Sequence, residues 1–265
     1  SVDTDYAGEV TINISGMPEG GKVRLEKYLD QNENGKVDTG EMLTQSLELT
    51  DGYVQVIGGV RNTSLPGDEN TTAKVIRTKY PFKAQSHPDR LFAGKYIYRA
   101  VRVDNGVSLG QTTFTLTQPN HAQTVSGQVT SGGSPVPYAM VALMDNQEDF
   151  VAGDLADASG NYTIKAPVGG TYEVYALKSG YIDERREHNP AEVFALTAGA
   201  SVTRNVVMSS ATRTISGRVT DFTTGAGLAG VMVDTETEDD GTTSYLTYAI
   251  TDANGNYTLN IPTYP

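Results

Sequence analysis

The sequence contains no cysteine, and its 265 residues include only three histidines. The lack of cysteine excludes disulfide bonds, thiolate metal sites and cysteine nucleophiles. The histidines are scattered, at His87, His121 and His188, and none begins the H-E-x-x-H pattern of a zinc peptidase. Neither a G-x-S-x-G motif nor a phosphate-binding or dinucleotide-binding glycine loop occurs. We therefore predict that this protein is not an enzyme.

Positive charge is also scarce, since 20 Lys and Arg residues face 32 Asp and Glu residues and leave a net charge of −12 at pH 7. Such a surface repels phosphate backbones, so nucleic acid is not an expected partner, whereas divalent cations are attracted. No apolar run approaches the roughly 20 residues that a membrane-spanning helix needs. We interpret Ser1 as a start from which any export signal has been removed, and we expect an extracellular, cell-surface protein.

What the sequence does contain is typical of strands and turns. Threonine, valine and tyrosine are prominent, with 15 tyrosines, and there are 28 glycines. The first three residue types fit a pleated surface better than a helix. A chain of this length suffices for two or three small domains of about 100 residues each. The predicted fold class is all-β, with tandem antiparallel β-sandwich modules.

Two short motifs occur twice in the same order. Thr124–Thr130 (TVSGQVT) recurs as Thr214–Thr220 (TISGRVT), and Asp157–Ile164 (DASGNYTI) recurs as Asp252–Leu259 (DANGNYTL). The first motif alternates like a half-buried strand. The second is a tight turn at its glycine, followed by another alternating strand. The repeat predicts two related modules in this part of the chain.

These motifs, the Pro- and Gly-rich segment after the first one, and the Gly-x-Tyr-x-Val strand at Gly170–Val174 resemble carboxypeptidase regulatory-like domains. The resemblance covers about 121–265. It implies a transthyretin-like β-sandwich, related to the B-type repeats of Gram-positive adhesins, in modules that are mostly non-catalytic spacers, accessories and surface repeats. We divide this part into a middle module (121–210) and a third module (212–265). The third module is expected to be incomplete, because it has no counterpart of residues 169–211. The simpler explanation is that the 265 residues are a fragment or the ordered part of a longer chain, and the other is that a neighbouring subunit donates the missing strand.

The first module (1–119) lacks these motifs but also alternates. Val10, Ile12 and Ile14 share one face of a predicted strand, which favours an Ig-like β-sandwich. The stretch 61–93 is polar and is predicted to be a long loop or an excursion at the edge of a sheet.

A calcium-loop pattern, D-x-[DN]-x-[DN]-G-x5-E, is matched in full by Asp30–Glu41. Gly35 permits the sharp turn that lets oxygen ligands converge. The alternation of Val23 and Leu25 before the loop favours flanking strands over EF-hand helices. Structural Ca²⁺ is therefore the expected ion, and the ordinary alternative is a solvated turn. The predicted ligands are Asp30, Asn32, Asn34, the Lys36 carbonyl, Asp38 and Glu41.

Weaker candidate sites are scattered along the chain. Two acidic clusters are candidate cation sites, although charged turns are usually only solvated. Asn62 and Asn70 are candidate glycan acceptors, and two tyrosine pairs are candidate sugar-stacking surfaces. The clusters are Asp145, Glu148, Asp149 and Asp154, and Glu236, Glu238, Asp239 and Asp240; the tyrosine pairs are Tyr96 with Tyr98 and Tyr245 with Tyr248.

Two functions are consistent with these patterns. The first is a non-catalytic extracellular structural module of an adhesin stalk or filament subunit, stiffened by calcium. The alternative is an accessory, carbohydrate-binding region of a larger secreted hydrolase. Expected partners are other copies or neighbouring surface domains, joined by strand complementation of the third module with Ser1–Gly8 as one candidate donor, and glycans.

Overall fold

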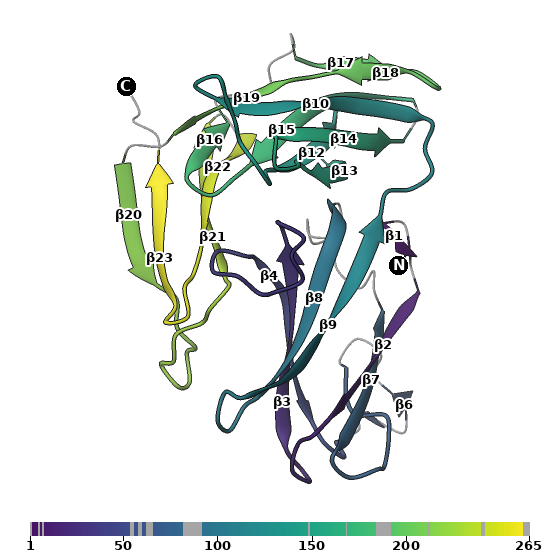
Figure 1. Cartoon of the computed structure of the whole chain (residues 1–265), viewed down its shortest axis with the longest axis vertical. Helices are drawn as coiled ribbons and strands as arrows, with labels where there is room; N and C mark the ends of the chain where they lie inside the picture. Colours follow the sequence, from purple (N-terminus) through teal and green to yellow (C-terminus); the bar gives the residue numbers. More distant parts are fainter. Residues whose placement is uncertain are drawn as a thin grey trace.

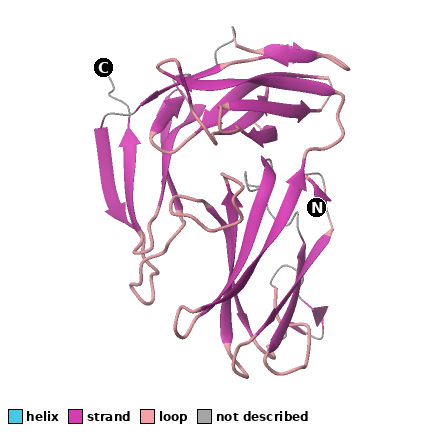
Figure 2. Ribbon diagram, viewed as in Figure 1, coloured by secondary structure: helices cyan, strands magenta, loops and turns pink. Residues whose placement is uncertain are grey.

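The described part of the chain folds into strands connected by turns and loops, and Figure 2 shows no helix in that part. The computed structural model describes residues 2–4, 6, 8–53, 56–57, 60–61, 66–81, 92–147, 149–167, 169–183, 192–210, 213–239 and 242–261. Within those ranges no helix is long and apolar enough to cross a membrane. The all-β prediction of tandem, mainly antiparallel β-sandwich modules is confirmed (Figure 1).

The first module consists of two facing sheets. Its larger sheet has the order β1, β9, β8, β3 and β4, and its smaller sheet pairs β2 with β7. Apolar side chains of both sheets, including Ile14, Leu25 and Ile76, form a buried core between them. The strands are β1 (Val2–Asp3), β2 (Glu9–Ser15), β3 (Lys22–Asp30), β4 (Leu43–Thr50), β7 (Val75–Pro81), β8 (Phe92–Arg102) and β9 (Ser108–Thr117), with a small hairpin of β5 (Val56–Ile57) and β6 (Val60–Arg61).

The prediction of a long loop over 61–93 is wrong for part of that stretch. β7 runs from Val75 to Pro81 and pairs antiparallel with the whole of β2. Ile76 and Thr78 of β7 are both fully buried. A threonine therefore fills a core position where the sequence pattern suggested a polar loop. Residues 82–91 lie outside the described part of the chain.

The middle module is also a sandwich. One layer contains β13, β12, β15 and β17, and the other contains β10 with β11, β14, β16, β18 and β19. Val125, Ile164 and Val174 belong to the core between the layers. The strands are β10 (Gln123–Ser131), β11 (Ser134–Pro135), β12 (Met140–Asp145), β13 (Phe150–Leu155), β14 (Asn161–Ala166), β15 (Gly170–Leu177), β16 (Tyr181–Asp183), β17 (Phe194–Leu196), β18 (Ser201–Thr203) and β19 (Val206–Ser210).

The first and middle modules share a sheet. β8 pairs in parallel with β13, so a nine-stranded sheet passes from one module into the other. A shared apolar cluster lies at this junction and contains Phe92 and Tyr96 of the first module, Met140 of the middle module and Tyr248 of the third. The modules are therefore packed against one another in addition to being connected by linkers.

The third module contains two strand pairs. β20 (Arg213–Arg218) pairs with β23 (Asn256–Ile261), and β21 (Met232–Asp239) pairs with β22 (Thr242–Ile250). The candidate donor strand at the N-terminus is engaged within its own chain, because Val2 pairs in parallel with Leu116 of β9.

Candidate metal centre between β3 and β4

The predicted calcium loop connects two strands of one antiparallel hairpin, β3 and β4. The expectation of strands on both sides of the loop is confirmed. Gly35 has a φ of 76°, a left-handed conformation that glycine adopts without steric cost. Glu33 is also left-handed, with a φ of 57°. These two residues let the chain coil tightly where the motif requires a turn.

Asp30, the first residue of the motif, is the centre of this coil. Its carboxylate is fully buried. Oδ1 accepts a hydrogen bond from the Asn34 amide at 3.0 Å, and Oδ2 accepts one from the Gly35 amide at 2.7 Å. The backbone therefore wraps around the first carboxylate, as a loop must if later residues are to face the same point.

Two further predicted ligands, Asn32 and Asn34, contact a third, Asp38. The side-chain nitrogens of Asn32 and Asn34 both donate to Asp38 Oδ2, at 2.9 and 2.5 Å. These two hydrogen bonds lower the pKa of Asp38. The two carboxamides thus supply positive charge density to one carboxylate oxygen, which is what a cation would supply at that place. Rotation of either carboxamide would present its oxygen instead.

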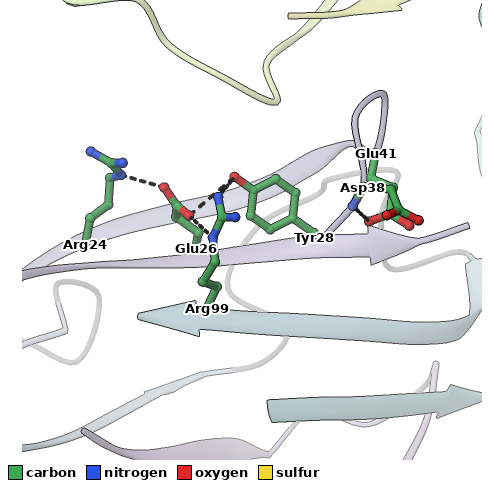
Figure 3. Close-up of polar contacts among 6 residues, drawn as sticks. All are labelled: Arg24, Glu26, Tyr28, Asp38, Glu41 and Arg99. Atoms are coloured by element: carbon green, nitrogen blue, oxygen red, sulfur yellow. Dashed lines mark hydrogen bonds and ion pairs between the residues drawn. The ribbon is translucent and has the colours of Figure 1, made fainter. Parts of the chain in front are cut away.

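Glu41, the last residue of the motif, has an incomplete set of partners. One carboxylate oxygen, Oε2, accepts a hydrogen bond from the Asp38 amide at 3.0 Å (Figure 3). The other, Oε1, is buried without a hydrogen-bond partner, and the residue is only 5% exposed. Burial raises the pKa of Glu41 to about 7, and the neighbouring charges of Asp30 and Asp38 contribute. Burial of a carboxylate oxygen without a hydrogen-bond partner is favourable only if the group is protonated or binds a cation.

The arrangement is not a closed carboxylate cage. Among the described residues, no three or more His, Cys, Asp or Glu side chains gather in a way that could hold a metal ion. The loop instead mixes two carboxamides with carboxylates, two of which, Asp30 and Glu41, also accept backbone amides. Ca²⁺ coordination would require the carboxamide oxygens and the Lys36 carbonyl in addition to the three carboxylates.

The loop contacts the neighbouring strands and the module junction. Lys95 Nζ of β8 donates to the Glu33 carbonyl at 2.6 Å, and Gln111 Nε2 of β9 donates to the Gly35 carbonyl at 2.7 Å. A cavity of about 340 Å³ separates the start of the loop from the middle module, and Glu33 and Asp154 are among its lining residues. A change in the conformation of the loop would therefore affect how the first and middle modules pack.

The first acidic cluster does not converge on one point. Asp145 Oδ1 accepts the amides of Gln147 and Asp149, which makes a local turn. Asp154 accepts the amide of Thr163 at 3.0 Å instead. Of the remaining members of the two clusters, Glu148 and Asp240 lie outside the described residues, as do the side chains of Glu236, Glu238 and Asp239.

The glycan-related candidates are only partly described. Asn70 uses its side chain within its own loop, since Nδ2 donates to the Val75 carbonyl at 2.8 Å. Tyr96, Tyr98 and Tyr248 are at most 4% exposed and present no ring face to a sugar. Asn62, His87, His188 and the Tyr245 side chain lie outside the described part.

Sequence reasoning missed a charged network on β3. Glu26 is 3% exposed, and its two oxygens accept hydrogen bonds from Arg24 at 2.7 Å and Arg99 at 2.9 Å (Figure 3). Arg99 also donates to the Tyr28 hydroxyl at 2.8 Å, and burial raises the pKa of Tyr28 to about 12. Alternating polar residues suggest a solvated face, but here a loop of the third module at Gly230 packs onto Tyr28.

Comparison with known proteins identifies the middle copy of the repeat. Residues 124–209 match the carboxypeptidase regulatory-like domain family. The carboxypeptidase regulatory-like domain thus coincides with β10–β19 and ends before the third module. No curated protein sequence matches the chain.

Solved structures show a distant likeness. The streptococcal ancillary pilin is 12% identical, with a TM-score of 0.28 over 97% of this chain and 87% of that protein. The Bacillus anthracis TIE protein is 13% identical, with a TM-score of 0.27 over 96% of this chain and 44% of its own. The group B streptococcus pilus 2b backbone protein is 12% identical, with a TM-score of 0.24 over 78% of this chain and 96% of its own.

Proposed function

We propose that this chain is a non-catalytic structural part of an extracellular cell-surface protein, an adhesin stalk or filament subunit, whose first module binds Ca²⁺ as a structural ion. One observation carries the proposal. The Asp30–Glu41 loop coils around a buried carboxylate, ends at Glu41 with an unpartnered buried oxygen, and lies where the nine-stranded sheet enters the middle module. A cation there would stabilise the junction.

Oxygen donors of this kind suit Ca²⁺, which takes six to eight oxygen ligands with flexible geometry. Asp30, Asp38 and Glu41 would supply charge, while Asn32, Asn34 and the Lys36 carbonyl would complete the shell. The two hydrogen bonds from the loop to β8 and β9 would transmit the ordering of the loop to the shared sheet. The effect of the ion would be stiffness at the junction, because neither flanking element is a helix that could reorient.

The alternative function, a carbohydrate-binding accessory region of a hydrolase, loses three of the four tyrosines that suggested it. Tyr98 lies inside the first module, and Tyr96 and Tyr248 belong to the shared cluster at the junction. Their rings are occupied by packing. No described feature favours this alternative over a structural role.

Calcium binding can be tested on the whole chain by melting in Ca²⁺ and in EDTA. An ion at a hundredfold excess over its Kd stabilises the folded state by about 2.7 kcal/mol, which corresponds to an increase in Tm of several degrees for a protein of this size. Asp30→Ala and Glu41→Gln should abolish the difference between the two melting curves. Asp221→Asn is the matched control, since Asp221 closes an exposed turn of the third module.

Identical melting curves in Ca²⁺ and EDTA for the unchanged chain would refute the calcium site. The surface role needs a separate measurement. Antibodies against the chain should label intact cells of the source organism, and brief external protease treatment should remove the label. Labelling that appears only after the cells are permeabilised would contradict an extracellular location.

A further inference from the structure

Asparagine is followed by glycine at three places in the chain, Asn34–Gly35, Asn105–Gly106 and Asn254–Gly255. At such a pair the glycine nitrogen can attack the side-chain carbonyl carbon of the asparagine, because glycine has no Cβ to obstruct the approach. Ammonia leaves, and water then opens the cyclic imide to aspartate or isoaspartate. All three glycines are left-handed, with φ values of 76°, 70° and 82°. What distinguishes the three pairs is the set of groups around them.

The hydrogen-bond acceptor of the glycine amide differs at the first pair. The Gly35 amide donates to Oδ2 of the fully buried Asp30 at 2.7 Å. The Gly106 amide instead donates to the Arg102 carbonyl at 2.9 Å, and the Gly255 amide likewise donates to a backbone carbonyl. A carboxylate can take the proton of an attacking nitrogen, whereas a peptide carbonyl cannot. Only the first pair therefore has a proton acceptor on its nucleophile among the described residues.

The carbonyl that would be attacked at the first pair is also held by a donor. Asn34 Oδ1 accepts the Lys36 amide at 2.7 Å, and this bond closes a ring that includes both the carboxamide carbon and the Gly35 nitrogen. An amide at this place stabilises the negative charge that develops on the oxygen during attack. Asn105 Oδ1 accepts the Val107 amide in the same way, at 3.0 Å. Asn105 is therefore a matched comparison that lacks only the carboxylate.

The nitrogen that would leave is fixed as well. Asn34 Nδ2 donates to Asp38 Oδ2 at 2.5 Å, so both ends of the carboxamide have partners. A side chain held in one orientation loses less entropy when the ring closes. Asn34 is exposed, so water reaches the departing nitrogen and the imide that follows.

We propose that Asn34 is a site of intramolecular deamidation, with Asp30 as the proton acceptor. The bond between the Gly35 nitrogen and the Asn34 Cγ forms as Asp30 Oδ2 takes the amide proton. The bond between Cγ and Nδ2 then breaks, and the nitrogen takes a proton from water and leaves as ammonia. Asp30 returns its proton to the solvent, so there is no net proton change. A second water molecule adds across one of the two C–N bonds of the imide and opens it.

Either product changes the connection between the loop and the shared sheet. An aspartate at position 34 places a like charge beside Asp38 in place of a donor. An isoaspartate inserts a methylene into the backbone directly before Gly35, whose carbonyl accepts Gln111 Nε2 of β9. The reaction is irreversible, so it would alter the module junction progressively as the protein ages.

The test is incubation of the whole chain at neutral pH in EDTA, with samples digested by trypsin and analysed by mass spectrometry. Trypsin cleaves after Lys27 and Lys36, so the peptide 28–36 contains Asn34 and neither of the other two pairs. Chromatography separates the aspartate and isoaspartate products. Asn34 should react at least about tenfold faster than Asn105, since a positioned proton acceptor typically contributes about 10²–10⁴-fold.

Variants and denaturation make the test specific. Asp30→Asn retains an acceptor oxygen but removes the base, so the rate at Asn34 should fall to that at Asn105. Glu33→Gln makes the same change of charge in the loop without touching the proton acceptor, and it should leave the rate at Asn34 unchanged. In concentrated urea, the three pairs of the unchanged chain should react at similar rates, because Asp30 no longer contacts Gly35. The urea comparison does not depend on the folding of any variant.

Three outcomes would overturn the proposal. The first is a rate at Asn34 in the folded chain that is no faster than the rate at Asn105. The second is an unchanged rate at Asn34 in Asp30→Asn. The third is a preference for Asn34 that persists in urea, which would assign it to the neighbouring sequence and not to the fold. All of these measurements are made in EDTA, so they are separable from a failure of the calcium site.

Discussion

Phe92 of β8 and Gly153 of β13 lie opposite one another in parallel register, and this pair joins the sheets of the first and middle modules. Ala93 and Asp154 form the next pair. Phe92 is 2% exposed and packs in the same cluster as Met140. Phe92 therefore belongs both to the continuous sheet and to the apolar cluster that the modules share.

Phe92→Ala should destabilise the chain by about 3–5 kcal/mol, as expected when a buried phenylalanine leaves a cavity. Urea denaturation of the whole chain measures this change through its midpoint. Phe222→Ala is the matched control, because Phe222 is fully exposed and its removal should change stability by less than about 0.5 kcal/mol. Equal midpoints for the two variants would show that the junction contributes nothing to stability.

Glu26 offers a test of the charged network on β3. Glu26→Gln leaves Arg24 and Arg99 without their carboxylate, so we expect a loss of roughly 1–3 kcal/mol, reduced by the partial exposure of both arginines. Glu48→Gln is the control, since Glu48 pairs with Lys22 at the surface, where such pairs contribute about 0–1 kcal/mol. A Glu26 variant no less stable than the Glu48 variant would contradict the structural role.

Gly230 couples the third module to the first. Its carbonyl accepts the Leu43 amide at 2.7 Å, and an added Cβ would lie 2.8 Å from Leu43 and 2.9 Å from Tyr28. Gly230→Ala should therefore increase hydrogen exchange and proteolysis of the third module. Gly225→Ala is closely matched, because both glycines are left-handed but Gly225 has open space. Similar exchange in the two variants would mean that the left-handed backbone conformation, and not the contact with Leu43 and Tyr28, causes the increase.

Local patterns predicted the strands well. Period-two alternation and glycine turns depend only on nearby residues, so the two copies of the repeat and the strands beside the calcium motif could be found from sequence. The loop predicted over 61–93 failed because Thr78 fills a core position and because Asp68, fully buried, closes a turn through backbone amides. Polar residues with such roles cannot be distinguished from solvated ones by composition.

The junction could not be predicted for a different reason. Tyr96 and Tyr98 alternate as a strand should, yet Tyr98 packs inside the first module while Tyr96 packs in the shared cluster. The cluster around Tyr96 includes residues of the middle and third modules, which are distant in sequence. Tyr28, which donates to Glu26, is likewise contacted by a loop of the third module at Gly230. For the calcium loop, the sequence supplied the candidate ligands, which stay a prediction, whereas the hydrogen bonds that tie the loop to β8 and β9 required the structure.

Asp154 should make the stability of the chain depend on pH. Burial raises the pKa of Asp154 to about 6, against the hydrogen bonds of the Thr163 and Leu155 amides, which lower it. Because the folded state holds this proton more tightly than the unfolded state, stability should rise as pH falls from about 7 towards 4. Asp154→Asn, compared with the unchanged chain in EDTA, should remove this contribution. The difference in unfolding free energy between the variant and the unchanged chain should therefore vary with pH in that window.

Asp157→Asn is the control: amide hydrogen bonds lower the pKa of Asp157, so its contribution is lost only at lower pH. A difference between the chain and Asp154→Asn that stays constant from pH 7 to 5 would show that Asp154 is ionised in the folded protein throughout this range.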